Sequence, residues 1–107
     1  MNEEIYEQAR TTLALFYSEA EPANAFEKSM KALPLYGRHR IAVGLLCHMV
    51  DAEGITELPK DLHTCFKCCL DSLQFFIMNK VAPEYEMASL DNCLKLGRDA
   101  LGRLNVV

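Results

Sequence analysis

Residues 38–53 read RHRIAVGLLCHMVDAE, and this stretch decides the fold. Apolar residues recur on nearly every side of a helix drawn through it. Only Arg40, Asp51 and Glu53 are plainly polar along its length, and Gly44 falls on the same side as the first two. A helix that is apolar almost all round is surrounded by other helices. We therefore expect residues 38–53 to form the central helix of the protein.

Proline and glycine residues divide the rest of the chain into further helical stretches. Apolar residues there recur at intervals of three and four, as in amphipathic helices, and no run alternates strictly enough to predict a strand. The predicted helices cover residues 3–20, 22–33, 59–80 and 83–104. Short loops between such helices force antiparallel neighbours. The predicted fold class is all-α: a compact, largely antiparallel bundle of four to five helices around the central helix, with residues 1–107 as one domain.

Individual residues mark the expected boundaries and contacts of these helices. Pro22 and Pro59 suit the first helical position, and Pro83 opens the last helix. Pro34 ends the second helix, because proline biases the residue before it away from the α region. Gly97 lies on the apolar stripe of the last helix, where it would permit close approach of a neighbour.

The composition excludes several classes of protein. The chain has 107 residues, half of them hydrophobic, which is typical of a globular domain and not of a disordered segment. Its apolar runs are too short to cross a bilayer, so we expect no membrane partner. The N-terminus is acidic at Glu3 and Glu4 where a secretion signal would be basic, which predicts a cytoplasmic protein.

The charge is distributed unevenly along the chain. The formal net charge is −4, whereas residues 28–50 carry four cations and no acid: Lys28, Lys31, Arg38 and Arg40. A nucleic-acid module usually has a basic isoelectric point, and the value here is about 5.3, so nucleic acid is an unlikely partner. The two arginines would sit at the positive end of the central helix, where acids from elsewhere in the chain or from a partner would compensate them.

A cluster of cysteines suggests a metal- or thiol-based sensor as an alternative function. Soft thiolates with an imidazole are the ligands that Zn(II) and Cu(I) prefer. The spacing is not that of a zinc finger, so the simpler interpretation is that Cys65 and Cys69 are core residues and Cys68 a surface thiol. The candidate zinc ligands are His63, Cys65, Cys68 and Cys69, with Cys47 or His48 completing the set.

Two expectations concern the histidines and catalysis. His48 falls among apolar residues of the central helix and is predicted to be a buried core histidine, whereas His39 and His63 are predicted to be exposed. No nucleophile elbow, phosphate-binding loop, dinucleotide fingerprint or HExxH motif occurs, so the chain is predicted not to be an enzyme and to need no cofactor.

The remaining signal is a surplus of apolar residues outside the predicted core. Cys68 and Phe75 lie on the outer side of the helix at 59–80, and Tyr85 and Leu96 leave the stripe of the last helix. Contiguous apolar surface marks an interface. We therefore expect a non-enzymatic interaction protein of the adaptor, chaperone or inhibitor type. It would bind a protein partner, or a second copy of itself, through these four residues.

Overall fold

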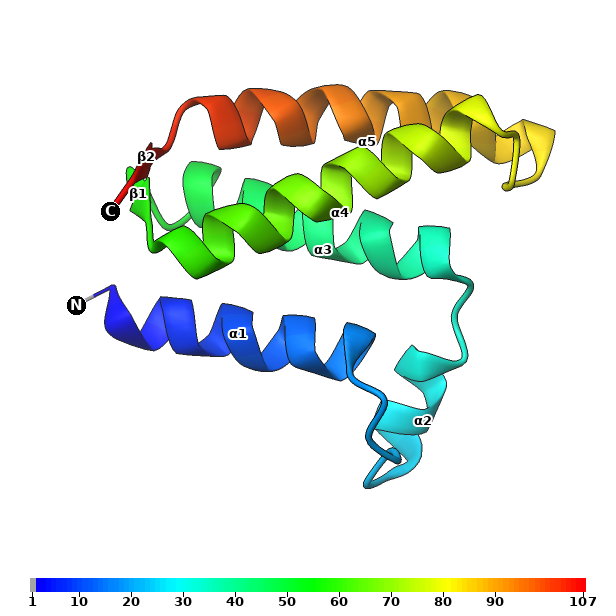
Figure 1. Cartoon of the computed structure of the whole chain (residues 1–107), viewed down its shortest axis with the longest axis horizontal. Coiled ribbons are helices and arrows are strands. Elements are labelled where there is room, and N and C mark those ends of the chain that lie inside the picture. The colour runs from blue at the N-terminus through cyan, green and yellow to red at the C-terminus, as the bar shows by residue number, and fades with distance from the viewer. Residues whose placement is uncertain (1) are drawn as a thin grey trace.

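The computed structural model describes residues 2–107 and confirms the all-α fold. Four long helices form an up-and-down bundle, and the short helix α2 projects from one end of it (Figure 1). The helices are α1 (Glu3–Tyr17), α2 (Ala25–Lys31), α3 (Leu35–Asp51), α4 (Lys60–Met78) and α5 (Glu84–Gly102). Among residues 2–107, no helix combines the length and apolarity that a membrane span needs.

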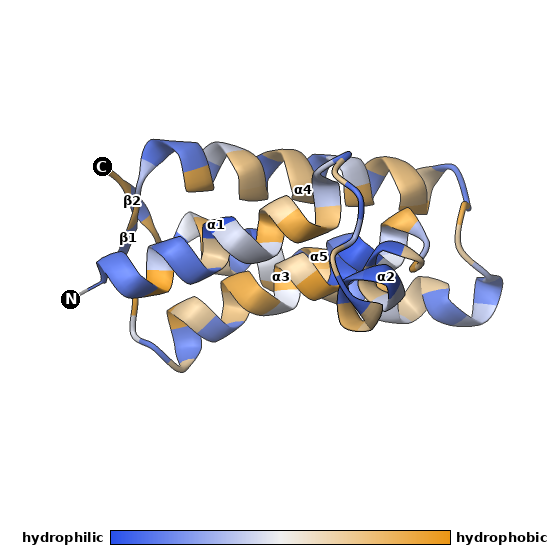
Figure 2. Cartoon of the chain, turned by 90° about the horizontal axis from the view of Figure 1, so that it is seen from below, coloured by the Kyte–Doolittle hydropathy of each residue, from blue (hydrophilic) through white to orange (hydrophobic). Residues whose placement is uncertain are grey.

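The four long helices are arranged around the α3–α4 pair. Helix α5 packs on one side of this pair and α1 on the opposite side, so that α1 and α5 lie at the two outer ends of the bundle (Figure 1). The ribbon of α3 is hydrophobic over most of its length, whereas α2 is largely hydrophilic (Figure 2). The core is therefore built on α3 and α4, as the apolar sequence of residues 38–53 predicts.

Helix α3 is not fully surrounded, which corrects one expectation. Its buried residues lie on the sides that face α1, α4 and α5. The remaining side is open, and Ile41 retains 41% of its surface there. The sequence overestimates the coverage because a bundle of this size supplies only three neighbours to α3.

The helix boundaries differ from the predicted ones by a few residues, and proline explains the pattern. Pro34, Pro59 and Pro83 each occupy the N-cap position, with φ between −60° and −56°, and their carbonyls accept the first helical hydrogen bonds. Proline fixes φ near −65°, which suits this position, and the missing N–H costs nothing there. Pro34 thus starts α3 instead of only ending the preceding helix, and Gly37 lies inside α3.

Helix α2 starts later than predicted because a capping box selects its first residue. The side chain of Asn24 accepts a hydrogen bond from the backbone of Glu27, and the Glu27 carboxylate accepts one from the backbone of Ala23. This reciprocal pair satisfies one donor in the first turn and one just before the N-cap, much as in a capping box. Pro22 is therefore outside the helix.

Two short strands, which the sequence analysis does not predict, close one end of the bundle. Strand β1 (Glu57–Leu58) pairs in parallel with β2 (Asn105–Val106), with Glu57 opposite Asn105. The Tyr6 hydroxyl of α1 donates to the Glu57 carbonyl at 2.6 Å. Two residues per strand are too few for an alternating pattern, and the pairing joins segments that are far apart in sequence.

Basic residues from other elements cap the C-terminal ends of α1 and α2. The Arg38 guanidinium donates to the carbonyls of Phe16 and Leu33, and the Lys31 ammonium donates to those of Ser18 and Ala20. Helix α1 has no cation in its own last turn. Cations at a helix C-terminus are favourable because the last carbonyls carry partial negative charge. These contacts explain why Arg38 is tolerated near the start of α3.

Candidate functional site

The predicted interface residues are all exposed. Cys68 and Phe75 lie on the outward side of α4, two turns apart, and Phe75 exposes 61% of its surface. Tyr85 and Leu96 are likewise exposed on α5. Exposure of an aromatic side chain to this extent is the kind of feature that marks an interaction surface when neighbouring apolar groups adjoin it.

The structure does not bring these four residues together on one face. Arg98 of α5 bonds Asp71 and Gln74 of α4, so a polar network separates the outward side of α4 from α5. Tyr85 and Leu96 instead share a side of α5 with Ser89, whose hydroxyl accepts a hydrogen bond from Arg40 of α3. Helices α4 and α5 therefore present two separate apolar surfaces.

An apolar groove lies between α1 and α4, and Cys68 is one of its lining residues. It consists of two cavities of about 400 Å³ and 250 Å³, which share Tyr17 and Cys65 as lining residues. We call this feature the α1–α4 groove. Its lining residues are Arg10, Leu13, Ala14, Tyr17, Ser18, Asp61, Leu62 and Cys65 in the larger cavity, and Tyr17, His39, Cys65, Cys68, Cys69 and Ser72 in the smaller one.

An ion pair closes one end of the α1–α4 groove, and aromatic rings form the other. Arg10 of α1 donates to both carboxylate oxygens of Asp61 on α4, at 2.8 and 3.2 Å. These bonds hold the pKa of Asp61 below its usual value. At the other end the Phe76 ring stacks on His39 with centroids 5.4 Å apart, and Phe75 lies edge-on to Phe76 at 6.1 Å.

Three polar side chains meet at the inner wall of the α1–α4 groove. The Tyr17 hydroxyl lies 2.6 Å from Nδ1 of His39 and 3.6 Å from the Cys69 sulfur. The Cys69 thiol also donates to the His39 carbonyl at 3.6 Å. His39 is only 5% exposed, and its Nε2 has no hydrogen-bond partner among the described residues.

Burial keeps this cluster uncharged. It lowers the pKa of His39 to about 4 and raises that of Cys69 to about 11. Burial also raises the pKa values of the Tyr17 hydroxyl and the Cys65 thiol. At neutral pH the walls between the Arg10–Asp61 pair and Phe75 therefore carry no formal charge, so the groove suits apolar or neutral polar groups.

The predictions for His39 and His48 are both wrong, for one reason. His39 is buried, whereas the side chain of His48 is 60% exposed and lies 3.4 Å from Glu53. Nine residues separate the two histidines, which places them on opposite sides of a helix with 3.6 residues per turn. Because α3 is apolar nearly all round, its sequence does not show which side faces inward. The spacing of His39 with Ala42, Val43 and Leu46 is the signal that could have found it.

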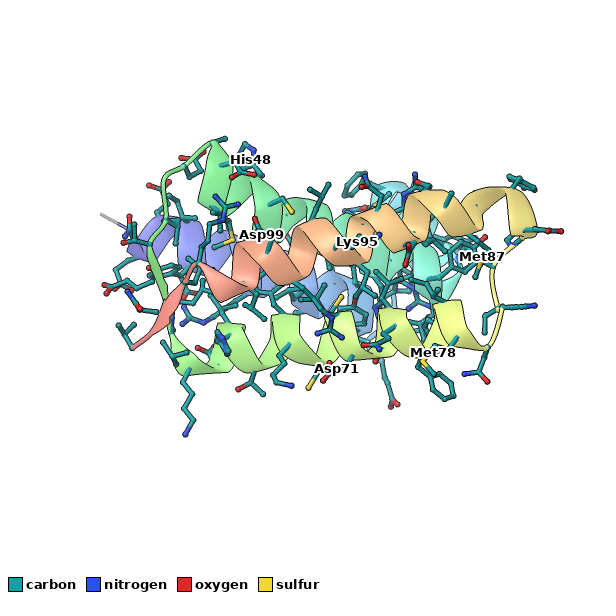
Figure 3. The ribbon with its side chains drawn as sticks, turned by 90° about the horizontal axis from the view of Figure 1, so that it is seen from above. His48, Asp71, Met78, Met87, Lys95 and Asp99 are labelled. Atoms are coloured by element: carbon teal, nitrogen blue, oxygen red, sulfur yellow. The ribbon has the colours of Figure 1, made fainter. Side chains whose placement is uncertain are left out.

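The candidate zinc ligands are dispersed in the structure. Cys65, Cys68 and Cys69 line the α1–α4 groove, whereas Cys47 and His48 of α3 do not. His48 lies on the side of the molecule away from α4 (Figure 3). His63 is half-buried on α4, outside the residues that line the groove. Within residues 2–107, no three His, Cys, Asp or Glu side chains are grouped so that they could hold a metal ion. The metal or thiol sensor stays a prediction without a preformed site.

Comparison of the chain with protein-family models, with curated proteins and with solved structures finds no match.

Proposed function

We propose that the chain is a non-enzymatic protein-binding module of the adaptor, chaperone or inhibitor type. It binds an apolar segment of a protein partner along the α1–α4 groove and the adjoining Phe75. The observation that carries this proposal is the position of Phe75, which is 61% exposed on α4 one turn beyond Ser72, the last α4 residue that lines the groove. Aromatic residues are enriched at the centres of protein interfaces.

The shape and chemistry of the groove favour a helical partner segment. The lining residues on α4 extend from Asp61 to Ser72, which is a length of about 16 Å, or three helical turns. An amphipathic helix presents apolar side chains at such intervals and lays them into a groove of this kind. Because the walls are uncharged, we expect the inserted side chains to be uncharged as well.

The basic residues do not support nucleic acid as the partner. Lys31 and Arg38 donate to backbone carbonyls of α1 and of the segments that follow α1 and α2, and Arg40 donates to the hydroxyl of Ser89. Three of the four cations of residues 28–50 are thus engaged within the chain. A phosphate backbone would have to compete with these contacts.

The chemistry of the Tyr17–His39–Cys69 cluster supports binding over catalysis. A catalytic cysteine acts as a thiolate, which requires its pKa to be lowered, usually by an adjacent imidazolium. Here the pKa of Cys69 is raised to about 11 and that of His39 is lowered to about 4. The pair therefore stays as a neutral thiol and a neutral imidazole, which can donate and accept hydrogen bonds but is a poor nucleophile.

Selection from a displayed library of amphipathic helical peptides tests the proposal. The wild-type chain should enrich peptides with apolar residues at positions i, i+4 and i+7, and Phe75→Asp should lose their capture by at least about tenfold. The free energy of unfolding of Phe75→Asp should also lie within about 0.5 kcal/mol of the wild-type value, because the Phe75 side chain is mostly exposed.

Phe26→Asp is the matched control, because it replaces another exposed phenylalanine, which lies on α2 outside the groove. It should leave peptide capture unchanged. If Phe75→Asp still enriches these peptides, or if both variants lose the enrichment equally, the α1–α4 groove is not the binding site. If Phe75→Asp fails to fold, Phe75 is a core residue and the proposal is wrong.

A further inference from the structure

A second apolar surface lies on the uncovered side of α3. Ile41, Gly44, Leu45 and His48 recur at intervals of three and four along it, and we call these four residues the α3 outer strip. Ile41, Gly44 and His48 are exposed and Leu45 is half-buried. A Cβ atom added to Gly44 would meet nothing within 4 Å. The strip is thus open to solvent at its centre.

Among residues 2–107, no other helix covers the α3 outer strip. Helix α1 contacts α3 on one flank, where Arg38 bonds Phe16, and α5 contacts it on the other, where Arg40 bonds Ser89. Helix α4 packs on the opposite side. Figure 3 shows His48 on the side of the molecule away from α4, whereas Asp71 and Met78 lie on the outer side of α4. The strip and the α1–α4 groove therefore lie on different faces of the bundle.

The charges at the two ends of the strip are opposite. Arg40 lies near its start, and Asp51 lies eleven residues later, about three turns along the same edge of α3. Asp51 is the last residue of α3, where the helix dipole disfavours an anion, whereas Arg40 lies in the second turn, beyond the reach of the dipole. A compensating charge from outside the helix would relieve the conflict.

The charges near these ends are not balanced within the chain. Arg40 donates to the Ser89 hydroxyl and forms no ion pair within the part of the chain that the structure describes. At the other end, one guanidinium, that of Arg103, serves two carboxylates, those of Asp51 and Asp99, at 3.1 and 3.3 Å. Glu53 adds a third carboxylate there, which lies 3.4 Å from Nε2 of His48. One end thus has an unpaired cation and the other a surplus of acid.

We propose that a second copy of this chain docks on the α3 outer strip, with the two α3 helices antiparallel about a twofold axis. In this arrangement Arg40 of each copy lies opposite Asp51 of the other, so both ends of the strip gain an opposite charge. A parallel arrangement would instead place Arg40 against Arg40. A twofold interface uses the same patch on both copies, and Gly44 near its centre lets the two helix backbones approach closely.

The exposed residues beside the strip supply further interface area. A stable interface buries about 800 Å² on each partner, and a helix of 17 residues is only about 25 Å long. Tyr85 and Leu96 lie on the side of α5 next to α3 and are exposed. The interface therefore takes in both residues, which were predicted from the sequence to contact a partner.

The dimer has a consequence that rests on the proposed function. Because the α3 outer strip and the α1–α4 groove lie on different faces, both grooves stay open in the dimer. Two linked partner segments would then bind with an avidity that a monomer does not have. The self-association itself does not depend on what the groove binds.

Sedimentation equilibrium of the wild type and of Gly44→Gln tests the dimer. At about 100 µM, a concentration that populates a dimer of micromolar Kd, the wild type should have twice the mass of the 12.1 kDa chain. Gly44→Gln should raise the dimer Kd at least about tenfold while the monomer stays folded, because glutamine favours helices and the site has open space.

Gly102→Gln is the matched control, since an added Cβ there also meets nothing within 4 Å. It should leave the dimer Kd unchanged. A wild-type chain that stays monomeric at this concentration would overturn the proposal, and so would a dimer that Gly44→Gln leaves intact. Phe75→Asp should not change the mass, which separates failure of the dimer from failure of the groove.

A pair of charge variants tests the opposite ends of the strip. Arg40→Glu and Asp51→Arg should each be monomeric alone, because each places like charges together at both ends of the interface. An equimolar mixture of the two should form heterodimers, because every facing pair is then of opposite charge. A mixture that stays monomeric, although both variants are folded, would show that these residues do not face each other.

The orientation has its own test. In the Arg40→Lys variant, a zero-length carbodiimide cross-linker should join the amine introduced at position 40 to Asp51 of the second copy. Peptide mapping by mass spectrometry identifies the joined residues. A dimer whose cross-links never include Asp51 would overturn the antiparallel arrangement.

Discussion

The two outer helices pack on the α3–α4 pair in different ways. Helix α5 approaches so closely that a Cβ on Gly97 would lie 2.5 Å from Leu70 and 2.7 Å from Val43. Helix α1 buries one row of side chains and is tied to α4 by the Arg10–Asp61 pair, but it packs less closely and leaves the α1–α4 groove between itself and α4. The α5 side has the tight packing of a core, and the α1 side leaves apolar surface exposed in the groove. In the proposed function, the same helix pair serves stability on one side and binding on the other.

The same Leu→Ala truncation should lower the free energy of unfolding by different amounts on the α5 side and on the α1 side. Leu90 of α5 and Leu13 of α1 are both buried, and Leu→Ala at a buried site costs about 2 to 5 kcal/mol. We expect Leu90→Ala near the upper end of this range, because its surroundings are rigid. Leu13→Ala should fall near the lower end, because it borders a groove that can rearrange. Urea unfolding of both variants measures the difference, and equal costs would contradict the comparison.

Adding a methyl group should separate the close-packed side from the open one. Gly97→Ala should lower the free energy of unfolding by about 1 to 3 kcal/mol, because Leu70 and Val43 would have to move in a filled core. Gly44→Ala on the open side of α3 should raise it by up to about 1 kcal/mol, because alanine favours helices over glycine. Thermal unfolding at a concentration low enough to keep the chain monomeric checks both signs.

The cluster on the α1 side should make stability depend on pH. Burial lowers the pKa of His39 to about 4 from 6.5, so the unfolded chain binds the proton more tightly than the folded one. The contribution of His39 to the free energy of unfolding is therefore fully present above about pH 6.5. It decreases by about 1 to 3 kcal/mol as the pH drops toward 4. His39→Gln should lose this slope between pH 7 and 4. A wild type with flat stability over that range would contradict the burial of a neutral imidazole.

A smaller effect should follow from removing one hydroxyl at the groove. Tyr17→Phe keeps the ring and deletes the group that lies 2.6 Å from Nδ1 of His39. We expect a loss of about 1 kcal/mol, because a buried imidazole nitrogen then has no partner. Tyr85→Phe, at a side chain that is 84% exposed, is a control for the loss of a phenol hydroxyl. Chemical unfolding that shows no difference between wild type and Tyr17→Phe would mean that this hydrogen bond contributes nothing to stability.

Local features of the sequence predicted most of the secondary structure. The intervals between apolar residues identified the five helices, because a helix repeats every 3.6 residues wherever it lies in the chain. The position of Gly97 on an apolar stripe predicted the close approach of α5. Cys68 and Phe75 were predicted to lie outside the core for the same reason, and both are exposed. These properties depend on residues within a few turns of one another.

Only the tertiary structure decided which sides of the helices meet. The inward side of α3 could not be read from residues that are apolar all round, so the burial of His39 and the exposure of His48 depend on where α1, α4 and α5 pack. The α1–α4 groove, the β1–β2 pair and the caps that Arg38 and Lys31 provide join residues far apart in sequence. The sequence by itself thus determined the helices, whereas long-range packing determined the surfaces that they leave open.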